Sequence, residues 1–137
     1  MGRVLAIDLG TKRTGIAVTD ILKITANPLE TIRTIDLDKF LKDYFSKEEV
    51  ETIVVGFPKS MDGSDTNMTQ PSIKLKEKLA AQYADKKVVL VDERFTSKLA
   101  MQSMITMGSK KKDRKEKAGN LDKISAAIIL QTYLEQI

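Results

Sequence analysis

The sequence contains neither cysteine nor histidine. The missing cysteine excludes disulfides, a thiolate nucleophile and cysteine zinc sites. The missing histidine excludes a Ser-His-Asp triad, a Cys-His pair, a histidine general base and histidine metal ligands. Any catalysis by this chain must therefore use carboxylates, lysine, tyrosine, hydroxyl groups or a metal ion bound through oxygen.

Long apolar runs are missing as well. No run approaches the roughly 20 residues that span a membrane, and no charged segment followed by an apolar one opens the chain. We therefore expect a cytoplasmic protein without a membrane partner. The 137 residues fit one domain, residues 1–137, that can bury a core.

The charge balance is mildly basic. Lys and Arg total 23 against 19 Asp and Glu, which gives a net charge of +4. This excess favours a polyanionic partner such as nucleic acid, although an ordinary basic domain explains it equally well. Aromatic residues make up only 5% of the chain, so base stacking is expected to be minor.

Hydrophobic periodicity predicts the secondary structure. The predicted strands are Arg3–Leu9, Thr14–Asp20, Ile24–Thr31, Thr52–Phe57 and Lys87–Val91. The predicted helices are Asp36–Ser46, Thr69–Ala84, a segment from Thr96 or Ser97 to Met107, and Asn120–Glu135. A β-meander followed by βα units predicts an α/β fold, a mixed five-stranded sheet flanked by helices. Sites in such sheets form at the carboxyl ends of the strands.

Asp8 interrupts the apolar stretch "VLAIDLGTKRTGIAV", although an isolated buried carboxylate costs several kcal/mol or more. Alternation along the strand places Asp8 on the face that carries Val4 and Ala6. Asp8 either hydrogen-bonds to the turn at Gly10–Arg13 or takes part in a site.

Two further acidic positions stand at the ends of predicted elements. Asp92 and Glu93 follow the fifth strand, where they form either a surface pair neutralised by Arg94 or part of a site. Asp122 falls in the first turn of the last predicted helix, where the helix dipole favours an acid without any function. Because carboxylates bind Mg²⁺ or Mn²⁺, and one or two such ions activate water for phosphoryl displacement, three acids without histidine suit metal-dependent hydrolysis.

Four segments, "AIDLGTKRTGIAVTD", "VVGFPKSMDGS", "VDERFTS" and "LDKISAAIILQTYL", resemble the YqgF family, whose members are described as Holliday junction resolvases or pre-16S rRNA nucleases. The resemblance covers essentially the whole chain. It implies an RNase H-like fold and a metal-dependent nuclease that processes the 5′ end of pre-16S rRNA during ribosome biogenesis. It also implies that the family's catalytic and metal-binding acids are Asp8, Glu93 and Asp122, with Ser125 where related resolvases often carry a further acid.

The family motifs also fall on residues that shape the predicted site. These are Gly10, Gly15, Gly56, Pro58 and Gly63. Basic residues near the site are expected to contact phosphates, which gives affinity that is independent of sequence and falls with salt. They are Lys12, Arg13, Arg94, Lys110, Lys111, Lys112 and Arg114. The run at Ser109–Lys117 is equally typical of a solvated loop.

Several functions stay open at this stage. The same acids could serve a DNA junction resolvase, which would need a dimer to place two sites on symmetric strands, and the sequence indicates a monomer or a weak homodimer. A non-catalytic RNA-binding module on a ribosomal precursor particle is another possibility. The "DLGT" turn also resembles the phosphate-binding turn of actin and sugar kinases, but those proteins close two such domains around a nucleotide.

Overall fold

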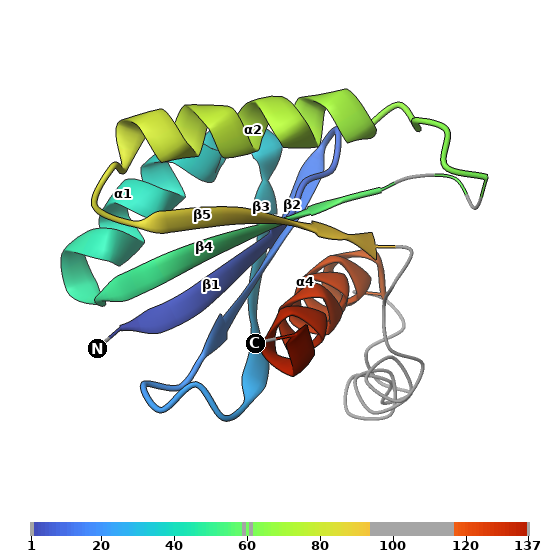
Figure 1. Ribbon diagram of the computed structural model, residues 1–137. Coiled ribbons are helices and arrows are strands. Elements are labelled where there is room, and N and C mark those ends of the chain that lie inside the picture. Colours follow the sequence, from blue (N-terminus) through green and yellow to red (C-terminus); the bar gives the residue numbers. More distant parts are fainter. Residues whose placement is uncertain (1, 59, 61, 94–116, 137) are drawn as a thin grey trace.

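Five strands form a mixed sheet in the order β3-β2-β1-β4-β5 (Figure 1). The computed structural model describes residues 2–58, 60, 62–93 and 117–136, with residues 117–122 described by their backbone alone. The strands are β1 (Arg3–Asp8), β2 (Arg13–Thr19), β3 (Ala26–Arg33), β4 (Val50–Phe57) and β5 (Lys87–Asp92). β1 to β3 form an antiparallel meander, whereas β4 and β5 run parallel to β1.

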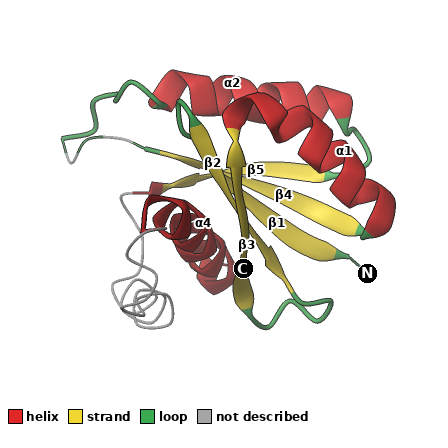
Figure 2. Cartoon of the chain, turned by 180° about the vertical axis from the view of Figure 1, so that it is seen from behind, coloured by secondary structure: helices red, strands yellow, loops and turns green. Residues whose placement is uncertain are grey.

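Helices cover both faces of the sheet, as Figures 1 and 2 show. The short helix η1 (Thr34–Asp36) leads into α1 (Leu37–Lys47), which connects β3 to β4, and α2 (Thr69–Gln82) connects β4 to β5. Both pack on one face, and α4 (Lys117–Gln136) packs on the other. No helix among the described residues is long and apolar enough to cross a membrane.

Alternation along the central strands divides the core into two clusters. Leu5, Ile7 and Ile53 point toward α1 and α2. Val4, Ala6 and Val54 point toward α4. Because residue 8 follows residues 4 and 6 in this alternation, Asp8 lies on the α4 face, as the sequence pattern predicted.

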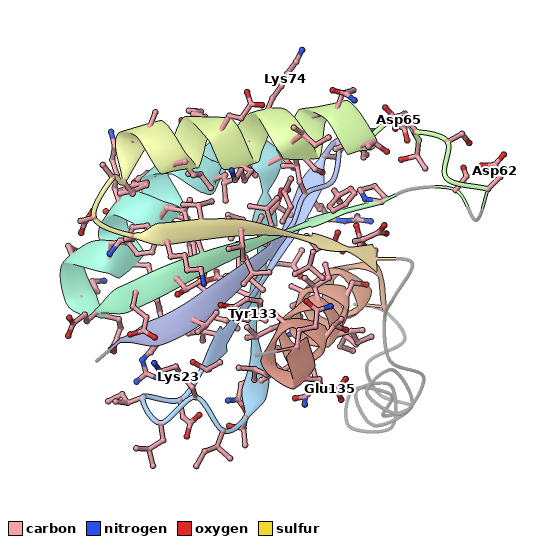
Figure 3. The ribbon with its side chains drawn as sticks, in the orientation of Figure 1. Lys23, Asp62, Asp65, Lys74, Tyr133 and Glu135 are labelled. Atoms are coloured by element: carbon pink, nitrogen blue, oxygen red, sulfur yellow. The ribbon has the colours of Figure 1, made fainter. Side chains whose placement is uncertain are left out.

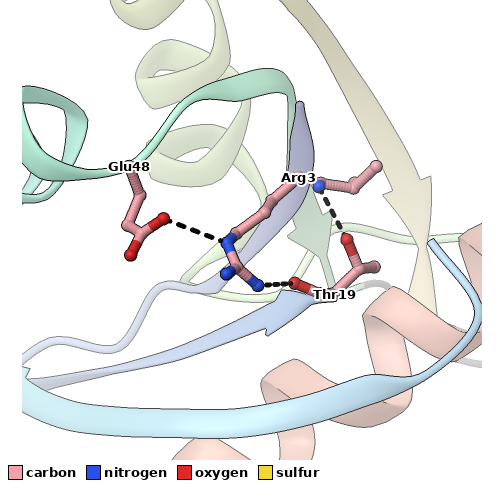
Figure 4. A network of polar contacts seen from close by, with 4 residues as sticks. Arg3, Thr19 and Glu48 are labelled. Atoms are coloured by element: carbon pink, nitrogen blue, oxygen red, sulfur yellow. Dashed lines mark hydrogen bonds and ion pairs between the residues drawn. The ribbon is translucent and has the colours of Figure 1, made fainter. Parts of the chain in front are cut away.

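Polar contacts hold the N-terminal end of β1 in place, as Figure 4 shows. The Arg3 guanidinium donates to the Thr19 carbonyl oxygen at 2.9 Å and pairs with Glu48 at 3.3 Å. The Val4 amide donates to Thr19 Oγ1 at 2.9 Å. The central strand is thus fixed to β2 at the end opposite Asp8.

Several predicted boundaries were wrong by two or three residues, among them both ends of β3, the start of β4, the end of α2 and the start of α4. The third strand begins at Ala26 rather than Ile24, because Asp20 Oδ1 accepts the amides of Ile24 and Thr25 at 2.8 and 3.1 Å and holds them in a turn. The last helix begins at Lys117 rather than Asn120, so Asp122 lies in its second turn and not its first. The predicted helix ending at Met107 lies outside the described residues.

The turn between β1 and β2 is built too closely for a side chain at Gly10. A Cβ atom added there would lie 2.3 Å from the Arg13 carbonyl oxygen, which is backbone and cannot move aside freely. Thr34 Oγ1 donates to the Gly10 carbonyl oxygen at 2.7 Å and closes the turn from the other side. Gly10 therefore determines the shape of the turn beside Asp8.

We predict that Gly10→Ala destabilises the protein by about 1–3 kcal/mol, because the added methyl group overpacks the turn. Urea unfolding followed by circular dichroism measures the change. An alanine at Ser46, which is exposed on α1, is the control and should change stability by less than about 0.5 kcal/mol. Equal stability of Gly10→Ala and wild type would contradict the close packing.

Candidate functional site

Asp8 ends β1 and is partly exposed on the α4 face of the sheet. Its partner across the antiparallel pair is Gly15 of β2. Gly15 is buried and adds no side chain beside the Asp8 carboxylate on that strand. A site-shaping role of Gly15 remains a prediction, and its position opposite Asp8 is compatible with that role.

Glu93 follows β5 directly, and its side chain reaches back over β4. A Cβ atom added to Gly56 of β4 would lie 3.4 Å from Glu93 Cγ and 2.4 Å from Ile129 Cδ1. Gly56 thus leaves space that Glu93 and Ile129 of α4 share. β4 lies between β1 and β5 in the sheet, so this space lies between the strands that carry the two acids.

The carboxyl groups of Glu93 and Asp8 affect each other. The pKa of Glu93 is raised from 4.5 to about 7, first by burial and then by the negative charges of Asp8 and Asp92. Burial and a nearby like charge both disfavour the ionised form. Strand order has therefore brought two acids from distant parts of the sequence into one partly buried, electronegative site.

Asp122 belongs to α4, but its side chain lies outside the described residues. Its position is about two helical turns before Ile129, which places the two residues on the same face of the helix. Among the described residues, no three acidic side chains form a metal-binding group. A role of Asp122 in the site is therefore a prediction.

The predicted basic residues divide into two sets. Lys12 and Arg13 are exposed at the turn between β1 and β2, beside the end of β1 that carries Asp8. The others lie outside the described residues. They are Arg94, Lys110, Lys111, Lys112 and Arg114.

The loop after β4 carries the remaining predicted site-shaping residues. The Pro58 carbonyl oxygen accepts a hydrogen bond from Thr69 Oγ1 in the first turn of α2. Gly63 adopts a φ of 90° beside Asp62, a backbone conformation that favours glycine. Figure 3 shows Asp62 and Asp65 on the part of this loop that projects away from the sheet.

Sequence reasoning missed two residues that shape the site. The sequence pattern indicated only that Ile129 is a core residue of the last helix, whereas in the structure its side chain fills the space above Gly56. Thr34 carried no motif, yet its backbone amide donates to the Lys12 carbonyl oxygen at 2.9 Å and its hydroxyl donates to Gly10. Both contacts join residues far apart in the sequence, so no local pattern indicates them.

Comparison with known proteins agrees with the family resemblance. A family model described as RuvX, Holliday junction resolvase, matches residues 2–136. A protein of Christiangramia forsetii is 50% identical over 134 residues, covering 98% of both chains. One of Phocaeicola vulgatus is 50% identical over 135 residues, covering 98% of this chain and 96% of that protein. Both bear the name "Putative pre-16S rRNA nuclease".

Solved structures show the same fold. The chain is similar to Thermus thermophilus RuvC, solved in complex with a Holliday junction substrate, with a TM-score of 0.63 and 14% identity. The match covers 99% of this chain and 96% of that one. It confirms the RNase H-like fold that the sequence motifs implied.

The raised pKa of Glu93 predicts a pH-dependent cost of folding. The unfolded carboxyl ionises near 4.5 and the folded one near 7. The folded state is therefore penalised as pH rises through this window, and the penalty is complete above pH 7. With divalent ions chelated, we expect Glu93→Gln to be more stable than wild type at pH 8 by about 1–3 kcal/mol, after discounting for partial exposure.

Urea unfolding at pH 4.5 and pH 8 measures this difference. The gain from Glu93→Gln should largely disappear at pH 4.5, where the folded carboxyl group is protonated and the unfolded one is about half protonated. Glu77→Gln, on the exposed surface of α2, is the matched control and should behave alike at both pH values. A gain of equal size at pH 4.5 and pH 8 would contradict the electrostatic origin.

Proposed function

The chain belongs to the RuvX family, and from this premise we propose that it is a metal-dependent nuclease that processes the 5′ end of pre-16S rRNA. The observation that carries the proposal is the pairing of Asp8 with Glu93 at one end of the sheet, where burial and mutual repulsion raise the pKa of Glu93. A site that concentrates negative charge in this way is suited to a divalent cation.

The donor set fits Mg²⁺ or Mn²⁺. Carboxylate oxygens are the hard ligands that these ions prefer, and the gap above Gly56 lets the Glu93 side chain lie against β4. Asp8 and Glu93 would hold the ion, and we assign Asp122 of α4 as the third ligand. A bound ion of this kind lowers the pKa of a coordinated water and stabilises the leaving oxygen in phosphodiester hydrolysis.

The residues of the chain itself bind and orient the substrate in this proposal. Lys12 and Arg13 would contact phosphates next to the bond that is cleaved, because they stand on the turn that follows Asp8. The five basic residues outside the described part of the chain would extend this contact along the nucleic-acid backbone.

A DNA junction resolvase is the second candidate, favoured by the description of the matching family model. This function would require a dimer that presents two sites to symmetric strands. A ribosome-assembly module that binds RNA without cleaving it is the third. Cleavage assays separate the three candidates because each predicts a different set of products.

We expect wild type with Mn²⁺ to cleave a labelled precursor RNA that spans the 5′ end of 16S rRNA, and Asp8→Asn to lose at least about 100-fold in rate because a ligand charge is removed. A four-way DNA junction is assayed alongside. Asp85→Asn, whose side chain is 80% exposed just before β5, is the control. Cleavage of the junction alone would favour the resolvase, and RNA binding without cleavage would favour the assembly module.

Metal binding can be measured without any turnover. We expect Mn²⁺ to raise the thermal midpoint of wild type, because a ligand that binds only the folded state stabilises it by mass action, about 2.7 kcal/mol at one hundred times Kd. Asp8→Asn should lose most of this shift, whereas Asp85→Asn should keep it. An equal Mn²⁺ shift in Asp8→Asn and wild type would remove Asp8 from the ligand set.

A further inference from the structure

An arginine pair, Arg13 and Arg33, lies at the end of the sheet that carries Asp8. The two residues are direct partners in the antiparallel pairing of β2 with β3, and both are exposed. Side chains of directly opposed residues stand on the same face of a sheet and lie close together. Arg33, which carries no family motif, therefore joins Arg13 in one basic patch.

This arginine pair shares a face with Asp8. Gly15 is the partner of Asp8, and Arg13 lies two residues from Gly15 along β2, so alternation places Arg13 on the same side. β3 is the second strand from β1 in the sheet, which puts Arg33 roughly 10 Å to the side of the Asp8 strand. The acids and the arginine pair thus follow one another across the sheet end, from β5 to β3.

Thr34 holds the arginine pair in a fixed relation to the turn. Its amide donates to the Lys12 carbonyl oxygen at 2.9 Å, and its hydroxyl donates to the Gly10 carbonyl oxygen at 2.7 Å. The hydroxyl groups of Thr14 and Thr34 lie 2.9 Å apart. Arg33 precedes Thr34 directly, so the same hydrogen bonds position both arginines relative to Asp8.

The two sides of β3 differ in charge, and the difference favours a polyanion on the α4 side over one on the α1 side. On the α1 side, an open hollow of about 420 Å³ is lined by Asp36, Lys39 and Asp43 and by the consecutive β3 residues 30–33. Arg33 borders this hollow because it belongs to that run, whereas alternation places its side chain on the other face. The acids that line the hollow repel phosphates from it. On the α4 side, Arg13 and Arg33 are directly opposed across the two strands, so two cationic residues stand on one face there.

We propose that Arg13 and Arg33 bind neighbouring phosphates of the substrate strand, so that the strand crosses the sheet end from the acids toward β3. The identity of the ligand as a nucleic acid rests on the proposed function, whereas the shared face of the two arginines follows from the strand register. RNA and DNA share the phosphodiester chemistry that the arginine pair would recognise. The pair would therefore determine the path of the nucleic-acid strand across the protein surface and add affinity that does not depend on base sequence.

The test measures the affinity of the full chain for a short labelled single-stranded RNA over a range of salt concentrations, with EDTA present to prevent cleavage. Each phosphate contact on a single strand contributes about 0.7 to the slope of log K against log salt. Arg33→Gln and Arg13→Gln should each lower this slope by about 0.7, similarly for RNAs of different sequence. Lys47→Gln removes one charge from the last turn of α1, near the opposite end of the sheet, and should leave the slope unchanged.

An unchanged slope in Arg33→Gln, or an equal decrease in Lys47→Gln, would overturn the proposal, as would a wild-type chain that binds no nucleic acid. DNA of the same sequence, run in parallel, tells which polymer the pair prefers. Cleavage of the RNA with Mn²⁺ is recorded separately. If RNA binding depends on Arg33 but no cleavage occurs, the nuclease proposal is contradicted and the role of the arginine pair is supported. If cleavage occurs but Arg33→Gln leaves the salt slope unchanged, the nuclease proposal is supported and the role of the arginine pair is contradicted.

Discussion

The burial of Glu93 beside Asp8 is the constraint on which the arrangement of this end of the molecule depends. Burial first, and then the charges of Asp8 and Asp92, raise the pKa of Glu93, so ionisation of this carboxyl group opposes folding. The remainder of the sheet must supply the stability that this ionisation removes. Buried aliphatic residues on both faces of β1 and β4 do so, which is typical of proteins whose functional sites are locally unfavourable.

Strand order makes the pairing possible. β4 separates β1 from β5, and any side chain larger than hydrogen at Gly56 would occupy the space between the two acids and α4. The glycine therefore acts in packing rather than in backbone flexibility. It lets Ile129 anchor α4 against the sheet while Glu93 extends across the same strand.

The sequence was informative wherever local chemistry decides the outcome. β-Branched runs ending at Pro58 and Asp92 predicted β4 and β5, and alternation placed Asp8 on its correct face. Prediction from the sequence failed where a side-chain contact, or a contact between residues far apart in the sequence, determines the structure. Asp20 accepts the amides of Ile24 and Thr25 and holds them in a turn, so β3 begins later than predicted. The start of α4 at Lys117 carries no local signal that the sequence pattern identified. The contacts of Thr34 with Gly10 and Lys12 became visible only once the strands were paired.

The contact of Ile129 with Gly56 has a consequence for how such chains can vary in length. A residue inserted or deleted in α4 between Asp122 and Ile129 turns one of them by about 100° around the helix axis relative to the other. The proposed metal ligand Asp122 would then leave the helix face that carries Ile129. Length changes elsewhere, in the segments that join the elements, carry no such rotation. Homologous chains should therefore differ in loop length freely but keep the helical phase between these two positions.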